Sequence, residues 1–256
     1  MKSNRLFYIP MLAAALTACS DVSEDDRYID TGVFNPARAV LIEDFTGQNC
    51  VNCPAAHEII EKLQEQYGDY VIPVSIHAGG FGIPADKGGL ATATGNEYND
   101  HWGINSWPAG VVDRNSGITT YDQWAAIART DMGKPSTMQL DIQATLSPDN
   151  ATADVIVTVN PEVTARASLQ VWVIESGIVA RQRSGNEIIR DYVHNNVFRA
   201  AVNGTWGQEI SYTAGDTDER TFTIDIDESW NTANLDIVAF VYDNSGVTVV
   251  NRSHIE

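Results

Sequence analysis

Two cysteines spaced C-x-x-C stand at the head of an amphipathic helix in residues 47–68, GQNCVNCPAAHEIIEKLQEQYG. Apolar residues recur there at helical spacing and so share one face: Ile59, Ile60, Leu63 and Tyr67. The preceding residues 38–45, RAVLIEDF, predict a strand that leads directly into the cysteines. A dithiol held between a strand and a helix therefore constrains the first half of the fold.

The chemistry of such a pair depends on its position. The pattern predicts that Cys50 sits where the helix begins, and there the free backbone amides and the helix dipole favour a thiolate. Cys53, one turn further on, is placed to attack a mixed disulfide at Cys50 and release the partner. We therefore favour a redox-active dithiol, and a structural disulfide remains the alternative.

Other uses of paired cysteines fit less well. A structural zinc site needs a second ligand pair, and no further C-x-x-C or H-x-x-x-H follows. A c-type haem site needs histidine directly after the second cysteine, where Pro54 stands. His57 and His77 could join the thiolates as copper ligands, but such histidines more often belong to the hydrogen-bonded framework. We predict neither a metal nor a cofactor.

Residues 1–18 read as a signal peptide, because two basic residues precede an apolar run. The run ends in Leu-Thr-Ala-Cys, which resembles a bacterial lipobox and predicts lipidation of Cys19. An ordinary signal peptide or a short membrane anchor are the alternatives. The acidic, polar residues 19–35 predict a flexible tether. Export places Cys50 and Cys53 in an oxidising compartment, where they rest as a disulfide unless reduced.

Residues 36–133 predict an α/β domain: the helix is followed by a strand at 69–77, a helix at 90–102, a short strand after Pro108 and a helix at 121–132. Asp44-Phe45, four residues, Cys50-x-x-Cys53 and the later WGINSWPA at 102–109 together resemble thioredoxin. The resemblance implies that Pro108 is a cis-proline facing the dithiol and that Asp44 is a buried acid that exchanges a proton with Cys53. A shift of one residue would give that place to Glu43.

Residues 137–256 change to alternating short strands separated by turns, which predicts an immunoglobulin-like β-sandwich. The strands are expected at 138–146, 153–159, 168–175, 220–226, 235–242 and 247–251. An aromatic-rich excursion at 188–212 interrupts them. Since the two thioredoxin motifs close within the first half, we expect that half to fold alone.

The lipobox, GQNCVNCP, the excursion and the closing AFVYDNSGVTVVN make the chain resemble the outer-membrane-protein-28-related lipoproteins of Bacteroidetes. The resemblance implies a thioredoxin-like domain, a β-sandwich and attachment to the outer membrane, facing the periplasm or the cell surface. We expect a tethered thiol–disulfide oxidoreductase acting on cell-envelope protein thiols or disulfides. The alternative is a non-enzymatic surface binding or adhesion protein. The net charge of −18 argues against a nucleic-acid partner.

Overall fold

The computed structural model describes residues 34–256. The predicted signal peptide, Cys19 and nearly all of the predicted tether lie outside the described residues. Within residues 34–256, no helix is both long and apolar enough to cross a bilayer.

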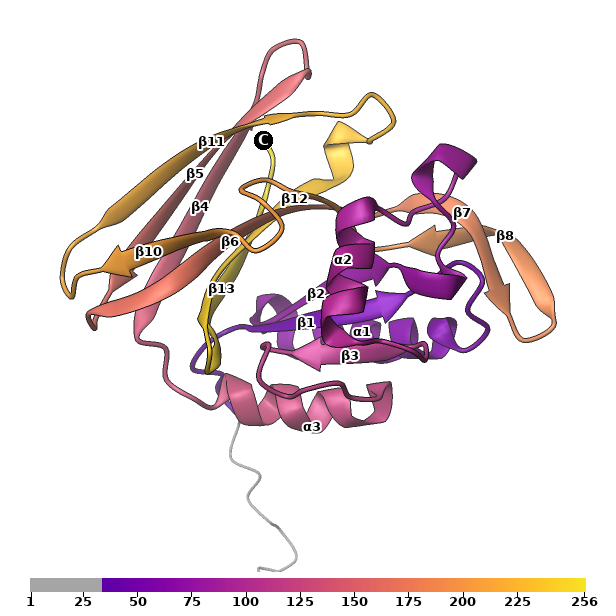
Figure 1. Ribbon diagram of the computed structural model, residues 1–256, viewed down its shortest axis with the longest axis horizontal. Coiled ribbons are helices and arrows are strands. Elements are labelled where there is room, and N and C mark those ends of the chain that lie inside the picture. The colour runs from indigo at the N-terminus through magenta and orange to yellow at the C-terminus, as the bar shows by residue number, and fades with distance from the viewer. Residues whose placement is uncertain (1–33) are drawn as a thin grey trace, which may run out of the picture. The chain divides into compact units, whose positions relative to one another are not determined.

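Helices and strands alternate in the first part of the described chain, and strands follow one another in the second (Figure 1). The helices are α1 (Cys53–Tyr67), α2 (Ala93–Trp102) and α3 (Tyr121–Met132), with short 3-10 turns at Gly68–Tyr70, Gly79–Phe81, Ala85–Lys87 and Thr232–Asn234. The strands are β1 (Val40–Thr46), β2 (Val71–His77), β3 (Ala109–Val112), β4 (Met138–Leu146), β5 (Thr152–Pro161), β6 (Ala165–Glu175), β7 (Ile178–Ser184), β8 (Glu187–His194), β9 (Val197–Ala201), β10 (Gln208–Tyr212), β11 (Asp218–Asp225), β12 (Leu235–Asp243) and β13 (Gly246–His254).

Local signals set where the helices begin. Thr92 caps α2 by accepting a hydrogen bond from the Gly95 amide at 2.9 Å. Thr120 and Gln123 form a reciprocal capping box at the start of α3. Pro54 lies in the first turn of α1, where a missing amide hydrogen leaves no intrahelical bond unmade.

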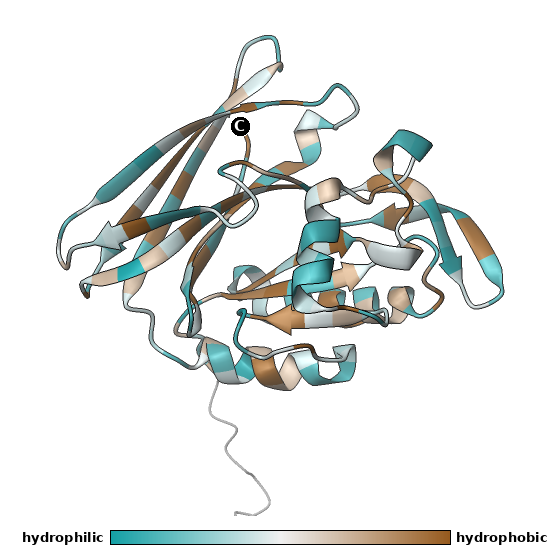
Figure 2. Ribbon diagram, viewed as in Figure 1, coloured by the Kyte–Doolittle hydropathy of each residue, from teal (hydrophilic) through white to brown (hydrophobic). Residues whose placement is uncertain are grey.

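Strand β1 lies between β2 and β3 and carries the chain into the dithiol. It pairs in parallel with β2 from Val40 opposite Val71 to Thr46 opposite His77, as the predicted β-α-β unit requires, and antiparallel with β3. Every residue of β1 and β2 is buried, because α2 lies in front of the strands in Figure 1 and α1 behind them. Figure 2 accordingly shows apolar residues concentrated along these strands.

The same sheet continues into the second half of the chain. Its strand order is β13-β12-β6-β9-β2-β1-β3, and β2 joins β9 where Ser75 pairs with Val197. The core around Phe45 and Ile76 also contains Trp172, Phe198 and Phe240. Residues 36–256 accordingly form one compact unit. The division into two domains, 36–133 and 137–256, stays a prediction. Hydrogen bonds of the shared sheet join the two segments.

A second core lies between β11-β5-β4 and the strands β6, β10, β12 and β13. The residues of β4 alternate between buried and exposed from Met138 to Thr145, as expected of a strand with one face on a core. The predicted combination of a mixed α/β sheet with further antiparallel sheets is therefore present. Its immunoglobulin-like type stays a prediction.

The excursion at 188–212 is more regular than the sequence indicates. It contains β8, β9 and β10, and β7 pairs with β8 in a separate two-stranded hairpin, residues 178–194. The strand pattern is hard to recognise because burial along β7 and β8 does not alternate. Only Gln182 and His194 are buried among the residues of these two strands, so the hairpin has no apolar core of its own.

Candidate functional site

Cys50 and Cys53 form a disulfide, with their Cα atoms 5.5 Å apart. Helix α1 begins at Cys53 and not at Cys50 as predicted, and Cys50 lies three residues earlier in the turn after β1. The Cys50 amide donates to the Gly47 carbonyl at 2.9 Å. Pro54 explains the difference, since it favours the first turn of a helix and so sets the start at the second cysteine.

The β7–β8 hairpin covers this disulfide. The Arg183 amide donates to the Gln48 carbonyl at 2.8 Å. The Gln182 side chain, itself buried, donates through Nε2 to the Cys50 carbonyl at 2.9 Å and the Gly47 carbonyl at 3.3 Å. Cys50 is 2% exposed and Cys53 is fully buried. Neither sulfur can therefore meet a protein partner while the hairpin is in place.

Asp44 lies on the face of β1 that packs against α1, and it is fully buried. Its Oδ2 atom accepts a hydrogen bond from the Ser75 hydroxyl at 3.4 Å, and Oδ1 has no partner among the described residues. Burial raises the pKa of Asp44 to about 8. Glu43 points to the opposite face and pairs with Arg114 at 3.0 Å. The residue beneath α1 is thus Asp44 rather than Glu43.

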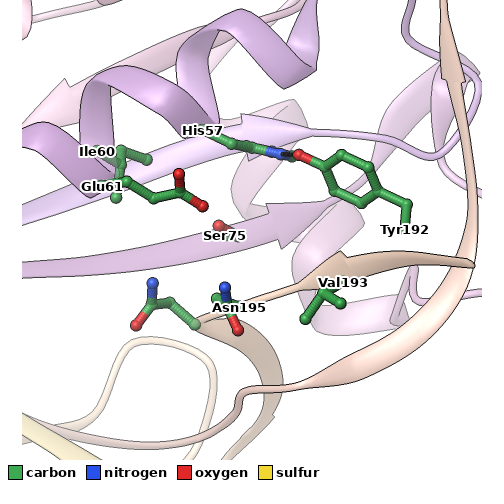
Figure 3. A pocket seen from close by; sticks show the side chains of 8 residues that line it. His57, Ile60, Glu61, Ser75, Tyr192, Val193 and Asn195 are labelled. Atoms are coloured by element: carbon green, nitrogen blue, oxygen red, sulfur yellow. Dashed lines mark hydrogen bonds between the residues drawn. The ribbon is translucent and has the colours of Figure 1, made fainter.

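His57 joins Asp44 to the covering hairpin. Its Nε2 atom lies 3.1 Å from the Thr46 hydroxyl and 3.5 Å from Asp44 Oδ2, and its Nδ1 atom lies 2.8 Å from the Tyr192 hydroxyl. Burial lowers the pKa of His57 to about 4, so the ring is neutral, with one nitrogen donating and the other accepting. Figure 3 shows His57 reaching from α1 toward Tyr192 on β8.

A cavity of about 20 Å³ adjoins this contact. It is lined by His57, Ile60, Glu61, Ser75, Tyr192, Val193, Asn195 and Asn196 (Figure 3). This volume is enough for one water molecule, and several lining side chains are polar. Glu61 stands on α1 beside the cavity, whereas Ser75, which donates to Asp44, lies on the strand below. The cavity therefore borders the surroundings of the buried acid.

His77 and His194 extend the cluster. His77 ends β2 beside Thr46, as predicted, and its ring meets that of His194 edge-on at 5.1 Å. Burial lowers the pKa of both rings, to about 4 for His194. Neither nitrogen of the His77 ring has a hydrogen-bond partner among the described residues. Within residues 34–256, no three His, Cys, Asp or Glu side chains are arranged to hold a metal ion.

The Trp107–Pro108 peptide bond is cis, as the thioredoxin resemblance implies. Pro108 directly precedes β3, where Ala109 pairs with Phe45 and Gly110 pairs with Asp44. The structure therefore brings Pro108 to the strand that bears the buried acid. Gln182 and Tyr192, which hold the hairpin over the dithiol, were missed, and no local pattern in the sequence marks them.

The profile of a protein family described as outer membrane protein Omp28 matches residues 95–256. No curated protein matches the chain. Two solved structures share the fold at 15% identity. HBP35 of Porphyromonas gingivalis has a TM-score of 0.70, covering 86% of this chain and 76% of that one. A protein from Agrobacterium tumefaciens has a TM-score of 0.51, covering 85% and 95%.

A domain of the outer membrane lipoprotein Omp28 from Porphyromonas gingivalis is 22% identical, with a TM-score of 0.34, covering 47% of this chain and 89% of that domain. The mixed α/β part of the present chain is thioredoxin-like.

Proposed function

Since the chain belongs to the Omp28 outer membrane protein family and carries a C-x-x-C disulfide in a thioredoxin-like fold, we propose that it is a cell-envelope thiol–disulfide oxidoreductase. Its partners would be protein thiols or disulfides of the envelope. The proposed roles are attack for Cys50, resolution for Cys53, proton exchange for Asp44 and presentation of the substrate backbone for Pro108.

The observation that carries the proposal is the state of Asp44. Burying a carboxyl group without a full set of hydrogen bonds destabilises a protein, and Asp44 Oδ1 has no partner among the described residues. A purely structural disulfide does not require a buried carboxyl group beside it. An exchanging dithiol does, because an acid with a pKa near 8 can take up and return a proton close to neutral pH.

In the reducing direction, the Cys50 thiolate attacks a disulfide of the partner protein. A Cys50–partner disulfide forms, and the partner's other sulfur leaves as a thiolate. Cys53 passes its proton to ionised Asp44 and attacks the Cys50 sulfur, which releases the partner's second thiolate. The pair loses two electrons and the partner gains them. The oxidising direction is the reverse of these steps.

The hairpin adds a step to this cycle. Cys50 and Cys53 are closed off by residues 178–194, so exchange requires the hairpin to move away first. Its attachments to the turn at Gly47–Val51 are a few hydrogen bonds, each contributing on the order of 1 kcal/mol. Opening of the hairpin therefore limits the rate of thiol–disulfide exchange but does not prevent it.

The same burial favours the second candidate, a surface binding or adhesion protein with a structural disulfide. In that case the disulfide fixes the turn on which the hairpin rests. The two candidates differ in what reduction does: an exchanging protein keeps its fold when reduced, whereas reduction of a structural disulfide that closes so short a loop lowers the stability of the fold by about 2 kcal/mol.

The test uses the purified chain without its leader. Its reduction potential is measured against glutathione, and the reduced protein is treated with iodoacetamide over a range of pH. We expect Cys50 to react first, because Cys53 lies in the first turn of α1 and is fully buried. Its rate should titrate below the free-thiol pKa of about 8.5, as is typical of a C-x-x-C motif. Cys53→Ser should trap a mixed disulfide with an envelope protein, with Cys50→Ser as the matched control. Equal, slow alkylation with no trapped partner would leave the structural disulfide.

Lipidation of Cys19 and attachment to the outer membrane are also part of the proposal, supported by the lipobox-like sequence and by the family's name. Cys19→Ala should release the chain from the membrane fraction into the periplasm. A membrane fraction unchanged by this substitution would contradict the anchor. The immunoglobulin-like type of the β-sandwich belongs to the proposal as well, supported by one core between the antiparallel sheet β11-β5-β4 and the antiparallel strands β6, β10, β12 and β13 of the mixed sheet.

A further inference from the structure

Three histidines lie where the β7–β8 hairpin meets the rest of the described fold. His194 is the last residue of β8, His77 is the last residue of β2, and His57 stands on α1. His77 and His194 are each 2% exposed, and the side chain of His57 is 13% exposed. We propose that protonation of this histidine cluster releases the hairpin, residues 178–194, and uncovers the disulfide while the rest of the fold persists.

The hairpin is lightly attached to the rest of the described chain. Strands β7 and β8 form a two-stranded sheet of their own beside the larger sheet (Figure 1). The backbone amides of Arg183 and Gly185 donate to the turn that holds Cys50, at 2.8 and 3.4 Å. Gly177 and Asn196 flank the hairpin with φ values of 72° and 56°, which glycine and asparagine adopt more readily than other residues. Local opening about these two positions therefore breaks few interactions.

His77 has only positive or potentially positive neighbours. Its ring meets the ring of His194 edge-on, with the centroids 5.1 Å apart. The charged or titratable groups that act on it are His194, His57 and Arg199. Arg199 disfavours a charge on His77 although it pairs with Glu175 at 3.1 Å. A proton added to His77 or to His194 therefore creates a buried cation beside other positive groups.

His194 belongs to the hairpin and moves with it. Its ring lies 4.8 Å from the Tyr192 ring, and the Ala180 and Arg181 carbonyls on β7 favour its charged form. Burial outweighs these carbonyls and lowers the pKa of His194 to about 4. Burial also raises the pKa of Tyr192 to about 12, so this neighbour is uncharged in acid. Release brings His194 into water, where the pKa of a histidine is about 6.5.

His57 joins α1 to the hairpin through the Tyr192 hydroxyl, at 2.8 Å. Asp44 lies 3.5 Å from the same ring, but burial raises the pKa of Asp44 to about 8. In acid this carboxyl is therefore protonated and cannot balance a charged His57. Glu58 and Glu61 on α1 are exposed to water, which screens their charges. Since burial lowers the pKa of His57 to about 4, its protonation also favours an open hairpin.

The open hairpin binds protons that the closed hairpin excludes, so a lower pH favours opening. For a histidine with a pKa of about 4 in the closed form and about 6.5 in the open form, the open fraction rises up to about tenfold per pH unit between these values. One such histidine contributes about twentyfold from pH 7 to pH 5. Asp44 acts on the whole fold in the opposite sense, because its raised pKa stabilises the fold as pH falls from about 8 to about 4.

The test measures how fast a water-soluble trialkylphosphine reduces the disulfide of the purified chain without its leader. Each rate is divided by the rate for a disulfide-bonded peptide of residues 47–54, which removes the pH dependence of the phosphine itself. We expect this ratio to rise at least about tenfold from pH 7 to pH 5. A ratio that does not change with pH would overturn the proposal. The phosphine requires no catalytic role of the dithiol, so the result is independent of thiol–disulfide exchange with a protein partner.

Hydrogen exchange followed by mass spectrometry separates local opening from unfolding. At pH 5, peptides from residues 178–194 should lose protection relative to pH 7, whereas peptides from β1 and β2 should keep it, after correction for intrinsic exchange rates. Loss of protection in the hairpin and in β1 at the same pH would mean that the whole fold opens, and this would contradict release of the hairpin alone.

Two variants locate the proton-binding groups. His194→Gln keeps a polar side chain that does not titrate, so it should remove about tenfold or more of the rise in the reduction ratio between pH 7 and pH 5. His77→Gln removes the facing ring and should also reduce the rise. His254→Gln, on the exposed end of β13, is the matched control and should leave the rise unchanged. A His194→Gln chain that is reduced faster at both pH values, with the same rise, would show that the histidine only holds the hairpin by packing.

Discussion

The Nδ1 atom of His57 on α1 lies 2.8 Å from the hydroxyl of Tyr192 on β8, although the two residues are 135 positions apart. The other nitrogen of the same ring lies near Asp44 Oδ2, at 3.5 Å. One imidazole thus contacts both the buried acid and the hairpin that covers the dithiol. Opening of the hairpin and proton exchange at Asp44 are therefore expected to be coupled.

Tyr192→Phe removes the hydroxyl that fastens β8 to His57 and retains the ring. We expect the disulfide to be reduced by dithiothreitol about two- to tenfold faster, because one hydrogen bond of about 0.5–1.5 kcal/mol no longer holds the hairpin. The measurement is the rate of thiol appearance in the native protein. Tyr70→Phe, at an exposed tyrosine outside the hairpin, should not change it. Equal rates for wild type and Tyr192→Phe would show that this contact does not close the site.

Asp44→Asn tests the buried acid. The pKa of Asp44 is about 8 in the folded state and near 3.8 in the unfolded state, so unfolding releases a proton between these values. The free energy of unfolding contributed by this residue therefore falls as pH rises from about 4 to about 8. The free energy of unfolding of the asparagine variant, minus that of wild type, should therefore be larger at pH 8 than at pH 5, by up to a few kcal/mol.

Urea unfolding at both pH values measures this difference, and Asp86→Asn on an exposed turn is the control. In the same variant, resolution by Cys53 should slow near neutral pH. A stability difference between variant and wild type that does not change with pH would show that Asp44 is ionised in the folded protein.

The buried histidines should destabilise the fold in acid. The pKa values of His57 and His194 are lowered to about 4, so below about pH 6.5 the unfolded state binds protons that the folded state excludes. Stability should thus fall as pH decreases from about 6.5 to about 4. His194→Gln should flatten this decline, whereas His254→Gln, on the exposed end of β13, should not. The check is thermal unfolding from pH 4 to pH 7.

The isolated fragment 36–133 should lack a cooperative transition, which reverses the expectation from the sequence. Its core would lose Trp172, Phe198 and Phe240, and β2 would become an open edge where β9 now pairs. Calorimetry and near-ultraviolet circular dichroism of the fragment, compared with residues 34–256, measure this. A sharp transition in the fragment would show that the first half forms its own core.

The local order of the first half follows from the sequence. Short-range rules place β1, α1 and β2 around C-x-x-C, because side-chain periodicity and Pro54 act within a few residues. The resemblance to thioredoxin implies that Pro108 is a cis-proline and that Asp44 is the buried acid. In the structure the Trp107–Pro108 bond is cis and Asp44 is fully buried. Only the position of Cys50 relative to the helix was misplaced, by one turn.

The sequence could not determine what covers the dithiol. Gln182 contacts Cys50 and Tyr192 contacts His57, each across more than 130 residues, and their own strands carry no regular pattern of burial. The single sheet that joins both halves depends in the same way on β9 meeting β2. Pairing over such separations is selected by the packing of the whole chain, which local periodicity does not encode. The sequence by itself therefore determined the dithiol and its supporting elements, and the tertiary structure decided its accessibility.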